Sequence, residues 1–189
     1  DYCILGLPTM RELKDKKLII RKNSRIRSHT IIYEGSQFGE GLETGHYVLI
    51  RENTIAGKNL RVGSFGDIEG DCIIGDFVRC HSYVHIGKGS KIGNFVWLYS
   101  LVTLTNDPLP PSLIEEPVII EDGVVICVGS IVLPRTVIRK GAFISAGSVV
   151  KGEIPPGAIV SGYDSSIVGY VTNLIDLPTM TRHPWMRHY

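Results

Sequence analysis

Two side chains with acid–base chemistry, Asp67 and His85, lie eighteen positions apart in the middle of the sequence. Thr103 follows His85 at the same interval. A carboxylate beside an imidazole orients the ring and favours its protonated form, so such a pair can work as a general base. This interpretation requires a fold that brings residues with this spacing into contact.

A polar, proline-rich segment begins directly after Thr103. It reads LTNDPLPPSLIEEP over 104–117, with prolines at 108, 110, 111 and 117. Each proline fixes its own backbone φ, so the segment is expected to be a stiff loop and a natural wall for a ligand cleft. The alternative is a surface insertion that the fold merely tolerates.

The elements that would position these residues follow from a six-residue repeat. An aliphatic or small residue recurs every six positions from Ile20 to Leu104 and again from Ile120 to Pro156, and a second series follows four residues later. Residues two apart share one face of a strand, and the Gly, Asp and Asn residues between them tolerate corners. Three such units make one triangular coil of three strands and three corners, and coils must stack to bury their inner faces.

The repeat predicts an all-β parallel β-helix of about seven triangular coils. Stacking places Asp67, His85 and Thr103 in one outward column, with about 4.8 Å between coils. We predict a single domain over 1–189, with a cap at 1–19, a β-helix at 20–162, a projecting loop at 105–119 and a short extension at 163–189. Segment 8–17 could form a short capping helix, and the tail 170–189 could cover a coil face or a neighbouring subunit.

Composition limits the other classes of function. The formal charge is +1, which does not indicate a nucleic-acid partner, and no apolar run is long enough to span a membrane. Cys72 and Cys80 fall on inward positions and are expected to be reduced core residues. Cys127 falls on an outward position, where a reactive thiol is the less favoured interpretation.

The repeat resembles that of the left-handed parallel β-helix acyltransferases, over roughly residues 20–170. The left-handed winding comes from this resemblance, because it opposes the usual right-handed crossover. Three segments are similar to N-acyltransferases of nucleotide-linked amino sugars: VTLTNDPLPPS (102–112), TGHYVLIRE (44–52) and IPPGAIVSG (154–162). The continuation YDSS (163–166) departs from the Pro-Ala pair usual in that family.

The resemblance implies a cytoplasmic homotrimer in which the loop walls a cleft between subunits. It implies transfer of an acyl group, acetyl in the simplest case, from acyl-coenzyme A to the amine of a nucleotide-linked amino-deoxy sugar. The amine would attack the thioester directly in a ternary complex, and no metal is needed. His85 would take the amine proton, although some relatives leave that proton to solvent or to the substrate's own phosphate.

The resemblance also assigns binding roles. Asn106 and Asp107 would bind sugar hydroxyls or the amine, although Asp107 could instead cap the turn before Pro108. His46 lies in the TGH segment and is a substrate-binding or structural candidate. His81 is a candidate for contact with the neighbouring subunit's loop and, less favoured, for catalysis.

The acyl donor is expected along a groove past the C-terminal coils. Small residues there leave the backbone approachable by the pantetheine arm, namely Gly129, Ala146 and Gly147. Four cations could meet the donor's phosphates, unless they are simply solvated corners: Arg135, Arg139, Lys140 and Lys151.

Three alternatives remain open at the level of sequence. The first is an acyltransferase for another small amine or hydroxyl, such as serine or an antibiotic. The second is a γ-class carbonic anhydrase-like protein, since HSYVH (81–85) contains two histidines and histidine is a common zinc ligand. That class holds zinc with three histidines across a subunit interface, and its ligand spacing does not match. The third is a non-catalytic scaffold.

Overall fold

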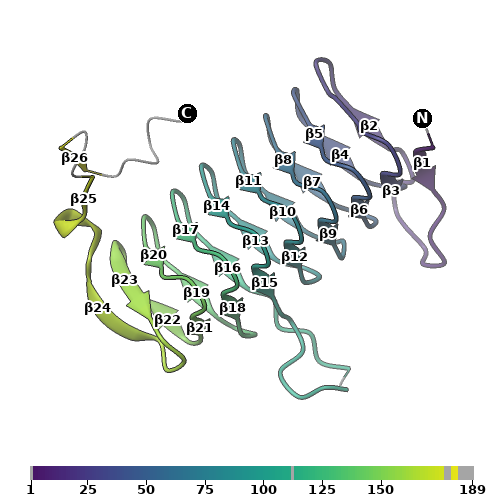
Figure 1. The fold of residues 1–189 in the computed structure, drawn as a ribbon. Helices are drawn as coiled ribbons and strands as arrows, with labels where there is room; N and C mark the ends of the chain where they lie inside the picture. The colour runs from purple at the N-terminus through teal and green to yellow at the C-terminus, as the bar shows by residue number, and fades with distance from the viewer. Residues whose placement is uncertain (1, 112, 177–179, 183–189) are drawn as a thin grey trace.

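The computed structural model describes residues 2–111, 113–176 and 180–182, and its main body is a solenoid of short parallel strands (Figure 1). Successive strands pass from sheet A to sheet B to sheet C and back to sheet A. Each of these three sheets has eight strands. The all-β parallel solenoid predicted by the repeat is therefore confirmed, while its winding sense stays a prediction.

The strands of each long sheet follow one another along the solenoid axis. Sheet A contains β1 (Ile4–Leu7), β3 (Ile31–Tyr33), β6 (Leu49–Ile50), β9 (Asp67–Ile68), β12 (His85–Ile86), β15 (Thr103–Leu104), β18 (Ile131–Val132) and β21 (Val149–Val150). Sheet B contains β2 (Ile19–Ile20), β4 (Gln37–Phe38), β7 (Ile55–Ala56), β10 (Ile73–Ile74), β13 (Lys91–Ile92), β16 (Ile119–Ile120), β19 (Val137–Ile138) and β22 (Glu153–Ile154). Sheet C contains β24 (Ser166–Tyr170), β23 (Ala158–Ser161), β20 (Phe143–Ile144), β17 (Val125–Ile126), β14 (Trp97–Leu98), β11 (Arg79–Cys80), β8 (Arg61–Val62) and β5 (Glu43–Thr44).

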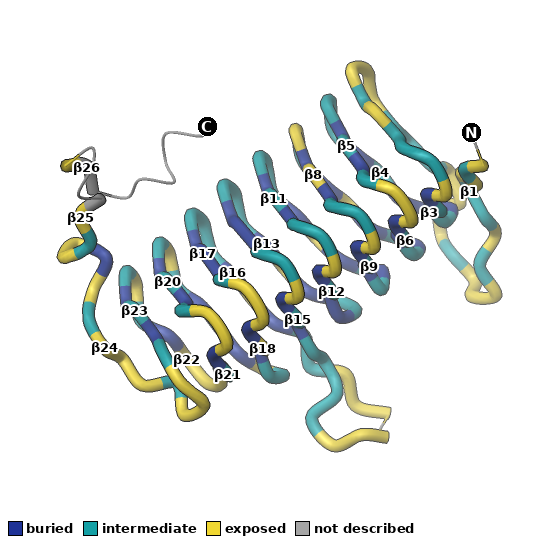
Figure 2. Tube along the Cα trace, in the orientation of Figure 1, coloured by how far each residue is buried: buried dark blue, intermediate teal, exposed yellow. Residues whose placement is uncertain are grey.

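The core is a set of inward columns along the solenoid axis. In β12 the second residue, Ile86, is fully buried while His85 beside it is only half-buried. Backbone bonds join adjacent coils, as from the Ile55 amide to the Cys72 carbonyl at 2.9 Å. Figure 2 shows buried positions recurring on coil after coil, with exposed positions between them. Each coil thus buries its apolar face only against its neighbours.

The corners are named by the sheets that they join. Corner CA follows a sheet C strand, corner AB follows a sheet A strand, and corner BC follows a sheet B strand. In corner CA, Tyr47, Phe65 and Tyr83 have φ of 56°, 59° and 61°, a region costly for residues with a side chain. Their rings stack at 5.2 and 4.9 Å between centroids, which offsets part of that cost.

The proline-rich loop leaves corner AB between β15 and β16. Sheet B partners Lys91 and Ile119 are ten positions further apart in the chain than partners Ile73 and Lys91, so the loop adds length without shifting the columns. Its base is closed by a 2.6 Å bond from the Glu116 amide to the Asn106 carbonyl. Figure 1 shows the loop projecting away from the stacked coils.

The expected capping helix at 8–17 is wrong. These residues form an irregular segment after β1, which itself pairs with β3 and extends sheet A. The Arg11 guanidinium bonds Glu52 at 2.9 Å and Asp71 at 2.8 Å, so the segment is held by ion pairs to two coils. A helix would compete with those contacts.

The inward position expected at Pro156 is also wrong. Sheet B partners Ile138 and Ile154 are two positions closer in the chain than the preceding partners, Ile120 and Ile138, because this coil is shorter. Ile154 is therefore the buried residue, and Pro156 is exposed.

The described end of the chain turns back on itself. Strand β24 pairs antiparallel with β23, and it is followed by a 3-10 helix, η1 (Val171–Asn173), and by the antiparallel pair β25 (Ile175–Asp176) and β26 (Thr181–Arg182). Most of the remaining tail, for which we expected cover of a coil face or subunit, lies outside the described residues. Among the residues described, no helix is both long and apolar enough for a membrane span.

The two core cysteines lie where the repeat predicts. Cys72 and Cys80 are buried, and burial raises the pKa of their thiols to about 11 and about 12. Cys127 is half-buried, and burial raises the pKa of its thiol to about 11. All three are therefore neutral thiols at ordinary pH, which does not favour a nucleophilic role for Cys127.

Candidate active site

The predicted column of Asp67, His85 and Thr103 is present on the outer face of sheet A. Asp67 is the register partner of His85, and His85 is the partner of Thr103. The Nδ1 atom of His85 lies 3.0 Å from Oδ2 of Asp67. The coil period thus turns a long separation in sequence into direct contact.

The electrostatics of His85 suit proton transfer. The hydrogen bond to Asp67 raises the pKa of His85, burial opposes that shift, and the charges of Asp67 and Glu69 add to it. Because Asp67 occupies Nδ1, Nε2 is the nitrogen that can accept a proton from a bound molecule. About a third of each side chain is exposed, so the pair is open to a ligand.

The second oxygen of Asp67 gives a further feature of this column. Oδ1 is shielded from solvent and has no hydrogen-bond partner within the part of the chain that the structure describes. A buried acceptor of this kind is costly unless something donates to it. A donor group of a bound molecule could therefore be stabilised beside His85.

A polar hollow of about 230 Å³ lies next to the column, on corner AB. Asn106 and Glu115 from the loop line it together with Glu69 and Lys88 from the coils. Lys88 bonds Glu115 at 2.8 Å, and its backbone amide donates to Glu69 at 3.1 Å. The structure therefore brings the start and end of the loop together at corner AB, which borders the sheet that carries His85.

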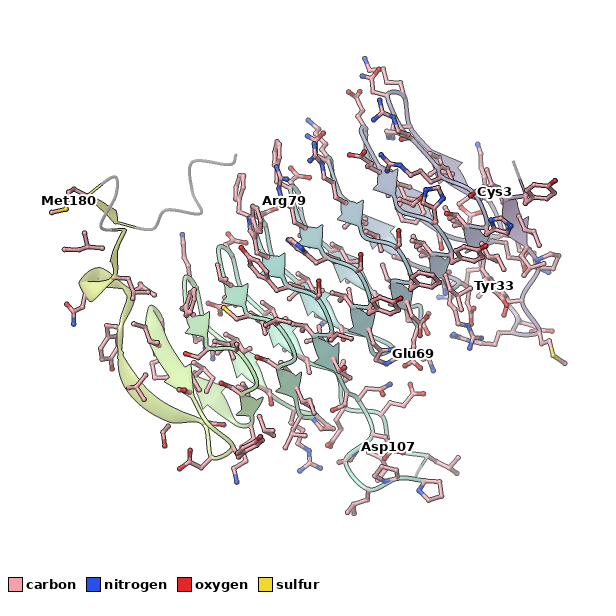
Figure 3. The ribbon with its side chains drawn as sticks, in the orientation of Figure 1. Cys3, Tyr33, Glu69, Arg79, Asp107 and Met180 are labelled. Atoms are coloured by element: carbon pink, nitrogen blue, oxygen red, sulfur yellow. The ribbon has the colours of Figure 1, made fainter. Side chains whose placement is uncertain are left out.

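The two polar residues at the start of the loop differ in their surroundings. Asn106 lines the hollow, whereas Oδ1 of Asp107 accepts a hydrogen bond from the Leu109 amide at 3.0 Å. Asp107 thus makes the turn contact that we considered as its alternative role. Figure 3 shows Asp107 on the projecting loop, away from Glu69 on the coils.

His46 and His81 lie on corner CA, on the other side of sheet A. The Nδ1 atom of His46 lies 2.8 Å from the Ser28 hydroxyl, and His81 stacks on Tyr99 with 4.6 Å between ring centroids. Both histidines line a larger hollow of about 550 Å³ on the outer face of sheet C. His81 and His85 are separated by Tyr83, so they do not converge on one point within a chain.

The three small residues proposed for the acyl donor share corner CA. Gly129, Ala146 and Gly147 are exposed, and the Gly147 amide bonds the Val128 carbonyl at 2.9 Å, one coil away. A Cβ at Gly129 or Gly147 would meet no atom within 4 Å, but their φ values of 69° and 67° favour glycine. These residues leave an open strip of backbone beyond the aromatic rings of the same corner.

The four proposed phosphate-binding cations do not gather around that strip. Arg135 and Lys151 lie on corner AB, and Arg139 and Lys140 lie on corner BC. Arg135 is paired with Glu116, and Arg139 is paired with Glu121 at 2.7 Å and Glu153 at 2.8 Å. Corner BC joins sheets B and C, so within one chain Arg139 and Lys140 do not lie beside sheet A, which carries His85.

The basic column of sheet C was not among the residues predicted for the site. Arg25, Glu43, Arg61 and Arg79 stack at successive coils. Three of them, Glu43, Arg61 and Arg79, line the larger hollow. Their regular spacing was a signal in the sequence, but the predicted acid–base site rested on histidines rather than arginines. Figure 3 shows Arg79 far from Asp107, on the opposite side of the solenoid.

Comparison with known proteins bears on the fold more than on the reaction. No protein-family model matches the chain. The chain is 36% identical over 67 residues to a 2,3,4,5-tetrahydropyridine-2,6-dicarboxylate N-acetyltransferase of Staphylococcus aureus. That match spans 35% of this chain and only 27% of the length of the curated relative.

A solved structure covers far more of the solenoid. The UDP-N-acetylglucosamine O-acyltransferase of Moraxella catarrhalis superimposes with a TM-score of 0.61, over 89% of this chain and 73% of that protein. The two proteins share a fold. Because their sequences are only 18% identical, this likeness concerns the architecture alone. The expectation of a hexapeptide-repeat parallel β-helix is thereby confirmed at the level of the fold.

Proposed function

We propose that this chain transfers an acyl group, acetyl in the simplest case, from acyl-coenzyme A to the amine of a nucleotide-linked amino-deoxy sugar. The observation that carries the proposal is the 3.0 Å contact between His85 and Asp67 on the face beside the loop. A neutral imidazole at this position can take the proton that an amine must lose when it attacks a thioester.

The reaction balances without a covalent enzyme intermediate. The amine nitrogen attacks the thioester carbonyl carbon, and its new C–N bond forms as the C–S bond breaks. The proton leaves the nitrogen for Nε2 of His85 and passes to the departing thiolate, so the products are an amide and free coenzyme A. Asp67 keeps Nδ1 occupied and stabilises the imidazolium that forms in between.

Other observations favour the same class of reaction. Asn106 lies in the hollow beside the column, where a sugar hydroxyl or amine could bind it. The loop segment resembles that of nucleotide-sugar N-acyltransferases. The matched Staphylococcus aureus relative is named as an N-acetyltransferase, and the Moraxella catarrhalis protein of like fold is named as an O-acyltransferase.

The proposal includes an assembly and a location. We propose a homotrimer in the cytoplasm, with the loop of one subunit walling the cleft of the next. The exposed rings of Tyr47, Phe65 and Tyr83 would give such an interface apolar surface. Acyl-coenzyme A and the nucleotide sugar would be the small-molecule partners, with Gly129, Ala146 and Gly147 approached by the pantetheine arm.

A panel assay tests the proposal. The protein is mixed with acetyl-coenzyme A and with nucleotide-linked 3-amino and 4-amino sugars, and free thiol release is followed. Turnover with one acceptor would establish the reaction class and the position of the amine. Turnover with none of the sugars would contradict the proposed acceptor.

The panel also includes 2,3,4,5-tetrahydropyridine-2,6-dicarboxylate, because the matched relative is named for it. Turnover with this compound alone would replace the sugar by a small dicarboxylate as the acceptor. Absence of both turnover and coenzyme A binding would instead favour a scaffold.

A further inference from the structure

The hollow on the outer face of sheet C has a composition that the proposed proton transfer does not use. It has a volume of about 550 Å³ and lies across corner CA from His85. Its lining includes three arginines, one glutamate and two histidines: Arg27, Arg61, Arg79, Glu43, His46 and His81. This excess of basic groups suits an anionic ligand.

Two of the arginines are direct neighbours. Arg61 and Arg79 are register partners in the pairing of β8 with β11, so their side chains emerge from adjacent strands on one face. Like charges placed in this way repel one another and destabilise a sheet. An anion bound between them would remove that repulsion.

The carboxylate in the hollow, that of Glu43, already contacts three arginines. Glu43 lies 2.9 Å from Arg27, 3.3 Å from Arg61 and 3.5 Å from Arg25. These contacts lower the pKa of Glu43, led by the hydrogen bond from Arg27, so it is ionised. Among the described residues that line the hollow it is the only acidic one, and a net positive charge remains.

One wall of the hollow is aromatic, and it helps to hold the Arg79 side chain in place. The Arg79 guanidinium lies 4.9 Å from the ring centroid of Trp97, a cation–π contact. His81 packs beside both Trp97 and Tyr99, at 5.9 and 4.6 Å between ring centroids, and those two rings are themselves 5.8 Å apart. Burial and the charge of Arg79 lower the pKa of His81, so its imidazole is neutral and can donate or accept a hydrogen bond.

We propose that this hollow binds the pyrophosphate of a nucleotide. The guanidinium groups of Arg61 and Arg79 come from strands about 4.8 Å apart, so each can take one of two linked phosphates through its planar fork of donors. The half-buried imidazole of His81 offers contact to the rest of the nucleotide. The inference rests on the proposed function, whose two substrates, a nucleotide-linked sugar and acyl-coenzyme A, both carry a pyrophosphate.

Binding is tested by calorimetry on the intact chain, with UDP, dTDP and GDP in one arm and coenzyme A in the other. The test variant is the double substitution Arg61→Gln with Arg79→Gln. We expect it to weaken binding in one arm by about tenfold or more, because hydrogen bonds to charged groups are lost. Glu43 keeps its contact with Arg27 in this variant, and a thermal melt checks that the solenoid stays folded.

The matched control removes two charges elsewhere. Arg21→Gln with Lys91→Gln changes two exposed cations outside the hollow and should leave both arms unchanged. A milder variant, Arg79→Lys, keeps the charge but loses the planar fork, and we expect it to weaken binding less than the double variant. If the double variant does not fold, Arg79→Lys tests the binding of pyrophosphate in its place.

Each outcome decides the proposal. Weakening in the UDP, dTDP or GDP arm identifies the sugar substrate as the source of the pyrophosphate, and weakening in the coenzyme A arm identifies the acyl donor. Unchanged affinity in both arms, equal weakening by the control, or no binding by the native chain overturns it. Because no turnover is measured, failure here is distinct from failure of the thiol-release assay.

Discussion

At the scale of single residues, the contact between His85 and Asp67 decides what chemistry the outer face of sheet A can perform. The carboxylate occupies Nδ1 and leaves Nε2 as the nitrogen for proton transfer. A base acts best when its pKa is close to the working pH, and a raised histidine pKa moves in that direction. Two substitutions separate the role of the ring from that of its partner.

Replacing His85 by asparagine tests the base directly. Asparagine retains a hydrogen-bonding side chain but cannot accept a proton near neutral pH. We expect turnover in the thiol-release assay to fall by about 10²–10⁴-fold, the usual contribution of a general base. A fall smaller than about threefold would indicate that the substrate sheds its proton without His85.

Replacing Asp67 by asparagine tests the positioning residue through pH. In the native chain the pKa of His85 is raised, so activity should fall on acidification with a midpoint above the ordinary histidine value. Asp67→Asn removes the negative charge and replaces the charge-assisted hydrogen bond by a weaker neutral one, so the pKa of His85 and the midpoint should move to lower pH. The kcat/KM–pH profiles of the two proteins provide the measurement, because kcat/KM reports the pKa values of the free enzyme.

A merely structural role for Asp67 predicts a different pattern. The variant would then lose turnover by the same factor at every pH, and its midpoint would not move. Thermal melts of both proteins, recorded across the same pH range, show whether any change comes from unfolding instead.

At the scale of elements, the loop between β15 and β16 should matter for turnover and little for stability. The described residues within 108–114 include none that is buried, and the bond between Asn106 and Glu116 closes the loop below them. Deleting 108–114 should therefore leave the thermal midpoint nearly unchanged. Turnover should fall by about tenfold to a hundredfold, because a wall that positions the substrate is lost.

The same deletion can refute this role of the loop. Unchanged turnover with the preferred acceptor would show that the loop is a tolerated surface insertion. Lower turnover with a lower thermal midpoint would place the effect in the fold, and a shorter deletion of 109–111 would then be the comparison.

Elements also show where prediction from sequence reached its limit. The inward columns were predictable because burial repeats on one face at a fixed period, as at Ile86. The segment 8–17 was not, because its shape depends on ion pairs from Arg11 to two acidic residues on distant coils. Pro156 was misplaced because the corner before β22 is two residues shorter than a constant six-residue period assumes.

At the scale of the whole molecule, each coil depends on its neighbours, so stability should vary along the solenoid. The amides of Ile19 and Arg79 make hydrogen bonds of the same 2.9 Å length, to Ser36 and Val96. Ile19 lies near the N-terminal end of the stack, where Ile20 is only partly buried, whereas Arg79 is in the middle. We expect the Ile19 amide to exchange at least about tenfold faster.

Hydrogen exchange read out by mass spectrometry provides this measurement. Equal protection of the two amides would mean that the described coils open together as one cooperative unit. In that case the nearest-neighbour description of the solenoid would be wrong for this protein.

The whole molecule also explains which parts of the site could be foreseen. The contact between Asp67 and His85 follows from the coil period alone, because outward residues one period apart on neighbouring strands are register partners. The grouping of Asn106 with Lys88 and Glu115 depends on how the loop folds back, which no period describes. The basic column of sheet C is equally periodic, so its signal was present in the sequence. It was missed because histidines rather than arginines were taken as the candidates for the site.

The ten residues that the loop adds and the two-residue contraction before Ile154 both leave the inward columns aligned. Corners therefore absorb changes in chain length that a strand would not. A duplicated or deleted stretch of one full period would add or remove one coil and keep every column in phase. Related proteins should accordingly differ in length by whole coils, and all other insertions and deletions should lie in corners.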